Sequence, residues 1–165
     1  MTAAAFGAIG KLRRDPMAML PFCGYNMADY WGHWLSIGKT RDAKLPKIFY
    51  VNWFRKNESG KFMWPGFGEN SRVLKWVFER CNDSAEAIDT AIGKMPTLDG
   101  LDLEGLDLNE SDKRNLLRVD VEGWLKELPD IEAYYDNFGD RLPDELRQQI
   151  KELKHRLHST RQAVA

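Results

Sequence analysis

The chain has 165 residues, enough for one domain with a substantial core. Its 24 basic and 25 acidic side chains nearly cancel, so no global field draws it to nucleic acid or to an anionic membrane. No apolar run approaches the roughly 20 residues that span a bilayer, and the N-terminus lacks the basic region of a signal peptide. Cys23 and Cys81 lie far apart and form no metal-binding pair. We expect them to be reduced, buried thiols of a cytoplasmic protein.

The first eleven residues are small and rich in glycine. They begin with Thr2, Ala3, Ala4 and Ala5 and end at Lys11. This composition suits a mobile loop or lid, and it suits a frayed terminus equally well. The pattern Gly-x-x-Gly-Lys that closes the segment lacks the glycine spacing and the Ser or Thr of a phosphate-binding loop, so we reject that function.

The segment Met27–Gly38 has helical spacing of its apolar residues. Its aromatic stripe, which includes Trp31 and Trp34, is more typical of a core than of a cofactor site. His33 lies off this stripe and has no second ligand at metal-binding spacing, so we expect it at the surface.

A hairpin is expected next. Lys47–Trp53 is rich in β-branched and aromatic residues and predicts a strand, and Asn57–Gly60 predicts a turn in which Gly60 takes a positive φ. Lys61–Trp64 would be the short return strand. From Asn70 or Ser71 to about Cys81 the spacing is helical again.

The centre of the sequence is the aromatic stretch from residue 52 to 71. Phe54, Phe62, Phe67 and Asn70 are expected at one end of the hairpin, facing the start of the helix. Flat rings beside an amide suit the recognition of a planar base, because stacking supplies affinity and an unpaired amide penalises the wrong base. Alternatively, Asn70 or Ser71 merely caps the helix and the rings fill a small core. The residues alone leave both interpretations open.

Between the two helical regions the signals are weaker. Residues 82–89 are polar, and Thr90–Pro96 is a weak candidate for a short strand. Leu98–Leu108 contains a small repeat whose acidic residues are out of register with a calcium loop. We interpret it as turns that hold leucines against the body of the protein.

The C-terminal third predicts helices. Asp120 would cap one helix, Pro129 would kink or break it near Leu128, and Gly139 would end it. A last helix opens at Pro143. Residues 120–160 thus predict a helical buttress, and the chain as a whole predicts a helix-rich α+β fold with a short antiparallel hairpin packed by helices.

The sequence around the aromatic stretch resembles GTP-dependent phosphoenolpyruvate carboxykinase. The string Trp-Pro-Gly-Phe-Gly-Glu-Asn, which ends at Asn70, is the most specific part. The resemblance covers nearly the whole chain and is looser toward the last helix. The lid segment and the C-terminal helices are similar to those of actinobacterial members. The matching segments are Asp15–Met19, Pro21–Asn26 and Leu45–Leu74.

The resemblance implies a guanine site. The base would lie between Phe54 and Phe67, with Phe62 beside it, Trp53 supporting the wall, and Asn70 reading the edge of the base. Thr2, Ala3, Ala4 and Ala5 are similar to the family's mobile lid, truncated here as segment 1–11. The nucleotide-binding residues implied in this way are Trp53, Phe54, Phe62, Phe67, Gly68, Glu69 and Asn70.

The family converts oxaloacetate and GTP to phosphoenolpyruvate, GDP and carbon dioxide in gluconeogenesis, with Mn²⁺ or Mg²⁺. Its phosphate loop, metal ligands and substrate-binding arginines lie upstream of the residues present, so the resemblance implies no catalytic or metal-binding residue here. We therefore expect residues 1–165 to be the C-terminal, guanine-binding part of a larger, monomeric enzyme, inactive without its N-terminal catalytic body. Met1 would be an artificial start codon.

Two alternatives remain open. The aromatic rings and basic side chains of Phe54, Arg55, Lys56, Phe62 and Phe67 suit a platform for single-stranded nucleic acid, although the balanced charge and the lack of a long basic groove argue against it. The chain also fits a folded fragment with no ligand.

Overall fold

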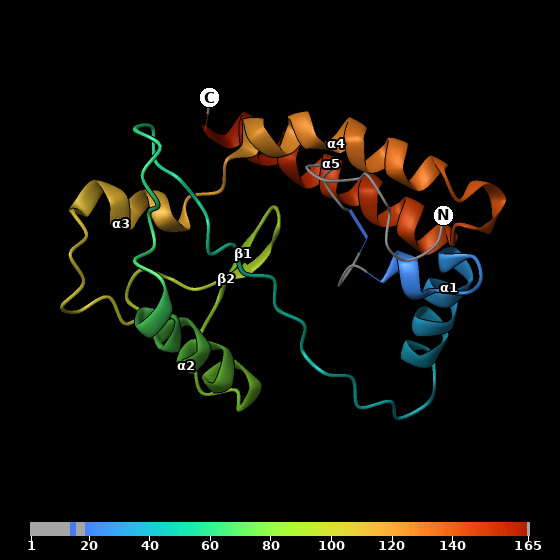
Figure 1. The fold of residues 1–165 in the computed structure, drawn as a ribbon, viewed down its shortest axis with the longest axis horizontal. Coiled ribbons are helices and arrows are strands. Elements are labelled where there is room, and N and C mark those ends of the chain that lie inside the picture. Colours follow the sequence, from blue (N-terminus) through green and yellow to red (C-terminus); the bar gives the residue numbers. More distant parts are fainter. Residues whose placement is uncertain (1–13, 16–18, 165) are drawn as a thin grey trace. The chain divides into compact units, whose positions relative to one another are not determined.

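The computed structural model describes residues 14, 15 and 19–164 (Figure 1). The predicted lid residues Thr2–Ala5 and the segment up to Lys11 lie outside this part. The chain forms two compact units. The helical unit comprises the described residues of Met1–Leu45 and Glu122–Ala165, and the aromatic unit is Pro46–Val121.

The helical unit begins with a short 3-10 turn, η2 (Leu20–Phe22), followed by α1 (Met27–Gly38). The predicted bounds of α1 are confirmed. Asn26 caps this helix, because its Oδ1 accepts a hydrogen bond from the amide of Ala28 at 2.9 Å.

The core of the helical unit lies where α1 meets the residues that follow α4. Trp31 is buried, as expected for the aromatic stripe, and its ring packs edge-on against Phe138 with centroids 4.7 Å apart. Trp34 on the same stripe is partly exposed, and His33 is exposed as predicted. The buried residues of this cluster are Met27, Ala28, Trp31, Phe138 and Leu142.

Helix α4 (Val121–Asp136) runs through Pro129, so of the predicted kink or break near Leu128 the break does not occur. Proline removes a single backbone donor, and Leu128 is buried in the packed face beside it. The helix ends at Asp136, before Gly139. Gly139 instead opens the 3-10 turn η4 (Gly139–Arg141) with φ +52°.

Helix α5 (Asp144–Val164) starts directly after Pro143, one residue later than predicted. It lies antiparallel against α4 (Figure 1). Arg161 near the end of α5 pairs with Glu122 at the start of α4, with Nε and Oε1 2.9 Å apart. Leu128 and Leu157 are buried, and the segment 120–160, expected to be a helical buttress, contains α4, η4 and most of α5.

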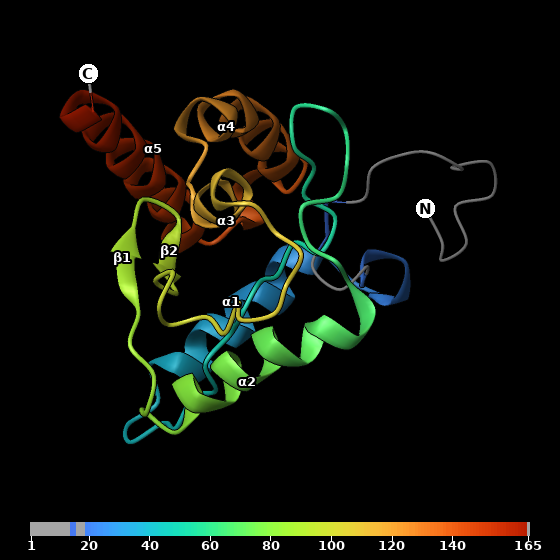
Figure 2. The same ribbon diagram turned by 90° about the vertical axis from the view of Figure 1, so that its left-hand side faces the viewer.

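The aromatic unit contains helix α2 (Asn70–Cys81), which confirms the predicted helix from residue 70. The 3-10 turn η3 (Phe67–Glu69) leads into it, and an antiparallel hairpin follows it (Figure 2), with Ile88 opposite Met95. The remaining elements of this unit are β1 (Ile88–Thr90), β2 (Gly93–Met95) and α3 (Glu110–Leu117).

The predicted strand Lys47–Trp53 is absent, and its expected return strand Lys61–Trp64 is reduced to one bridge between Lys56 and Phe62. β-Branched and aromatic residues favour a strand only when a partner strand covers them. Here Phe49 packs edge-on against Trp76 instead, with ring centroids 6.0 Å apart. The two-stranded hairpin lies at residues 88–95, so only its second strand falls within the weakly predicted Thr90–Pro96.

The core of the aromatic unit is built around Trp64, Trp76 and Leu101. Leu103 and Leu106 pack against it, which confirms that the turns of Leu98–Leu108 hold leucines onto the body. The start of α2 therefore packs against the buried tryptophans of this core.

The predicted fold class, a helix-rich α+β arrangement, is confirmed. The prediction that Cys81 is buried is wrong. Cys81 follows Leu74 and Phe78 along the exposed face of α2, and Cys23 is half-buried; both thiols are free. None of the described helices combines the length and apolarity needed to cross a bilayer.

Candidate functional site

The loop that precedes α2 brings two of the predicted rings together. Asn57 closes its turn, since the Asn57 carbonyl accepts from the Gly60 amide at 2.9 Å and Gly60 has φ +77°, as predicted. The bridge between Lys56 and Phe62 then sets Phe54 edge-on to Phe62, with ring centroids 6.2 Å apart. Lys56 Nζ lies 5.1 Å from the centroid of the Phe62 ring, a cation–π distance.

Phe67 has an unusual position. Its φ is +38°, in the left-handed region that residues other than glycine rarely adopt, and the residue is 98% exposed. Within the described residues its ring contacts no other aromatic ring. Phe54 is 73% exposed and Phe62 is 52% exposed. These three rings therefore do not fill a core, whereas Trp64 of the same stretch does.

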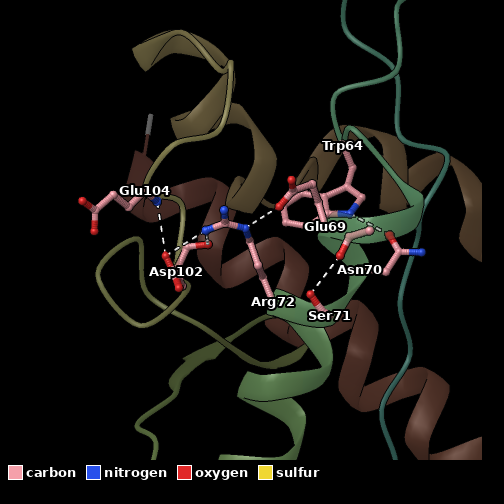
Figure 3. Close-up of polar contacts among 8 residues, drawn as sticks. Trp64, Glu69, Asn70, Ser71, Arg72, Asp102 and Glu104 are labelled. Carbon is pink, nitrogen blue, oxygen red and sulfur yellow. Dashed lines mark hydrogen bonds and ion pairs between the residues drawn. The ribbon is translucent and has the colours of Figure 1, made fainter.

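Asn70 is the first residue of α2, but it does not cap the helix with its side chain. Its Oδ1 accepts a hydrogen bond from Nε1 of Trp64 at 2.9 Å (Figure 3). The hydroxyl of Ser71 donates to the carbonyl of Gly68 at 2.8 Å. The oxygen end of the Asn70 amide is thus hydrogen-bonded to a buried indole.

A charged cluster fixes the turn that carries Phe67, Gly68 and Glu69. Arg72 pairs with Glu69 through Nε and with Asp102 through Nη1, the latter at 2.9 Å (Figure 3). The hydrogen bond to Glu69 raises the pKa of Arg72 above its ordinary value. The cluster joins η3 to the Leu98–Leu108 turns.

Arg55, the residue after Phe54, anchors the loop to α3. Its Nη1 donates to the carbonyl of Leu116 at 3.1 Å and its Nη2 to the carbonyl of Arg118 at 2.8 Å. Burial and the neighbouring charge of Arg118 lower the pKa of Arg55. The loop is therefore tied to the C-terminal end of α3.

The predicted site residues fall into four groups. Phe54 and Phe62 touch each other, and Phe67, Gly68 and Glu69 form η3 immediately before Asn70. Trp53 is half-buried and packs against the core of the aromatic unit. The lid residues Thr2–Ala5 lie outside the described residues.

Sequence reasoning left Trp64 and Arg72 out of the site. A signal existed for each of them. Trp64 precedes Asn70 within the most specific string, and Arg72 follows Glu69 at the i, i+3 spacing of a helical ion pair. The described residues contain no group of three or more His, Cys, Asp or Glu side chains that could hold a metal ion.

Comparison with known proteins gives consistent matches. The family described as phosphoenolpyruvate carboxykinase C-terminal P-loop domain matches residues 1–156. Over 94% of its length the chain is 54% identical to phosphoenolpyruvate carboxykinase (GTP) of Arthrobacter sp. (strain FB24). Over 99% of its length it is 50% identical to the protein of that name from Treponema pallidum (strain Nichols). It spans only 26% and 27% of the length of these two relatives.

Proposed function

The chain belongs to the GTP-dependent phosphoenolpyruvate carboxykinase family, and we propose that residues 1–165 supply the guanine-binding part of such an enzyme. The observation that carries this proposal is the conformation of Phe67. A fully exposed aromatic ring on a left-handed backbone costs free energy and contributes nothing to the core. Such a residue is accounted for by a ligand that stacks on it.

The remaining rings and the amide complete the proposed site. Phe54 and Phe67 sandwich the base, and Phe62 lies beside it with Lys56 over its ring. Each stacked ring contributes roughly 1–3 kcal/mol and tolerates any base. Selectivity therefore depends on Asn70, with Trp53, Gly68 and Glu69 shaping the surroundings.

The parent enzyme, in this proposal, converts oxaloacetate and GTP to phosphoenolpyruvate, GDP and carbon dioxide. Its partners are GTP or GDP and the remainder of the carboxykinase chain, which the relatives' greater length supports. A monomeric parent in the cytoplasm belongs to the same proposal, since free thiols such as Cys23 and Cys81 persist in a reducing compartment.

The Mn²⁺ or Mg²⁺ of the reaction does not fit the described residues, because no group of three metal-ligating side chains is present among them. We assign no metal-dependent step to this part of the protein. Without phosphate and metal contacts, the base site alone should bind GTP with a dissociation constant in the mM range, about −4 kcal/mol.

A nucleotide titration tests the proposal. The isotopically labelled chain is titrated with GTP to several times this concentration, while the amide signals of Phe54, Phe67 and Asn70 are followed. Saturable shifts at these three positions support a guanine site. No response would leave a folded fragment without a ligand. Tighter binding of a short single-stranded oligonucleotide, with a steep loss of affinity in salt, would favour a nucleic-acid platform instead.

A further inference from the structure

The side chain of Trp64 is oriented by the core. It is 5% exposed and packs in the cluster that contains Trp76 and Leu101. Its Nε1 lies 2.9 Å from an oxygen of the Asn70 side chain. An indole N–H is a donor only, so the atom that faces it must be the amide oxygen and not the amide nitrogen.

This contact decides what Asn70 can offer to a ligand. The hydrogen bond fixes which way the amide faces: Oδ1 is turned toward the indole, so Nδ2, a donor, is the end turned away from Trp64 and able to meet a ligand. Guanine carries an acceptor at position 6 of the ring, and adenine carries an amino donor there. A donor from the protein therefore pairs with guanine and opposes adenine.

We infer that Trp64 is a positioning residue that makes Asn70 select purines with a 6-oxo group. The inference rests on the proposed guanine site and names the origin of its selectivity. Stacking on Phe54 and Phe67 gives affinity for any base, whereas the Trp64–Asn70 hydrogen bond gives discrimination. Trp64 acts through Asn70 and touches no ligand in this account.

Neighbouring contacts hold the backbone of Asn70 independently of Trp64. Arg72 ties Glu69 to Asp102, and Ser71 closes the turn onto Gly68 (Figure 3). Removal of the indole N–H should consequently release the amide to rotate about its own side chain without displacing the start of α2. This separation makes the inference testable.

The first experiment compares Trp64→Phe with Trp76→Phe in the full chain. Trp76 is the matched control, because it is equally buried in the same cluster and its Nε1 donates to the carbonyl of Glu86 at 3.3 Å. The measured quantity is the ratio of the dissociation constants of ATP and GTP. We expect a ratio of roughly 5 to 100 in the wild-type chain and in Trp76→Phe. In Trp64→Phe it should fall toward one, mainly through tighter ATP binding.

A second variant reverses the polarity. Asn70→Asp keeps an acceptor for the indole but presents a second acceptor to the ligand, so it should bind ATP more tightly than GTP. Asn82→Asp, at the other end of α2, is the control with the same change of charge and should keep the wild-type preference.

A third measurement needs no nucleotide. In ¹⁵N spectra of the free chain, Asn70→Ala should shift the indole N–H signal of Trp64, and Trp64→Phe should shift the side-chain amide signals of Asn70. Trp76→Phe should leave those amide signals unchanged, which a purely structural role of Trp64 does not predict.

The outcomes separate the two claims. A wild-type chain that prefers GTP, with the same preference in Trp64→Phe, overturns the inference and leaves the guanine site standing. A wild-type chain that binds no purine nucleotide overturns the proposed guanine site, and the inference falls with it.

Discussion

Arg55 donates a hydrogen bond from Nη2 to the carbonyl oxygen of Arg118, 2.8 Å away, and one from Nη1 to the carbonyl of Leu116. The guanidinium thereby satisfies two carbonyls at the C-terminal end of α3, where helical carbonyls lack partners along their own helix. Because Arg55 follows Phe54 directly, the same contact fixes the start of the loop that carries the first predicted ring.

Replacement of Arg55 by Met should destabilise the aromatic unit by about 1–3 kcal/mol, because the carbonyls of Leu116 and Arg118 each lose a charged donor. Urea unfolding followed by tryptophan fluorescence measures this change. Lys61→Met is the control, since Lys61 is exposed on the same loop and its ammonium group forms no hydrogen bond or ion pair that the structure describes. Equal stability of the two variants would contradict the anchoring role.

Phe67 allows a prediction that separates folding from binding. The free energy of unfolding of Phe67→Gly should be about 1 kcal/mol higher than that of Phe67→Ala, because glycine accepts the positive φ that alanine resists. Phe67→Gly should therefore unfold at a higher urea concentration. Both variants should lose about tenfold in GTP affinity with the ring removed. Urea unfolding and the nucleotide titration together measure the two effects.

Phe78→Ala serves as the control for both effects. Phe78 is also exposed and lies on α2, two turns beyond Asn70, at φ values that are not left-handed. It should retain GTP affinity. Loss of affinity in this variant equal to that in Phe67→Ala would show that exposed rings in general, and not Phe67, bind the nucleotide.

Local sequence patterns predict the structure of those segments whose conformation depends mainly on their own residues. α1 and α2 were predicted from apolar spacing, and the turn at Asn57–Gly60 from its residue types. α3 was missed even though Asn109 caps it, its Oδ1 accepting from the amide of Asp112 at 2.8 Å. Its few apolar residues give a weak helical signal, and packing against Trp64 and Trp76 stabilises it.

The site shows the same division. The rings and Asn70 were identified from the sequence, but nothing in it reveals that the Asn70 oxygen faces Trp64 or that Arg72 reaches Asp102. The first contact depends on how the core orients Trp64, and the second joins α2 to a turn 30 positions away. Residue spacing along a single helix or strand predicts neither contact. The absent strand at Lys47–Trp53 has the same origin, since strand formation depends on a partner elsewhere in the chain.

The apolar residues on the exposed face of α2 predict that the chain self-associates. Leu74 and Phe78 lie one turn apart and are both more than half exposed, which is unusual for apolar residues that share a helix face. We expect the chain to self-associate as its concentration rises, and Leu74→Ser with Phe78→Ser to abolish this in sedimentation experiments. Ile88→Ser, an equally apolar exposed residue on β1, is the control. A wild-type chain that stays monomeric at mM concentration would contradict the expectation.

The hydroxyl of Tyr134 is buried in the helical unit, and it has no hydrogen-bond partner among the residues that the structure describes. An unpaired buried hydroxyl costs about 1–3 kcal/mol, so Tyr134→Phe should be as stable as the wild type or up to about 1 kcal/mol more stable. Tyr50→Phe, at an exposed position, should have no effect.

The same tyrosine makes stability depend on pH in the alkaline range. Burial, with a smaller effect of Asp15, raises the pKa of Tyr134 from 10.0 to about 12. The folded state therefore holds this proton more tightly than the unfolded state, and the resulting stability is complete below pH 10 and is lost as the pH rises toward 12. Burial also raises the pKa of Tyr135, so Tyr134→Phe should reduce this loss without removing it. Urea unfolding at pH 8, 10 and 11 measures the slope, and an unchanged slope in Tyr134→Phe would contradict the assignment.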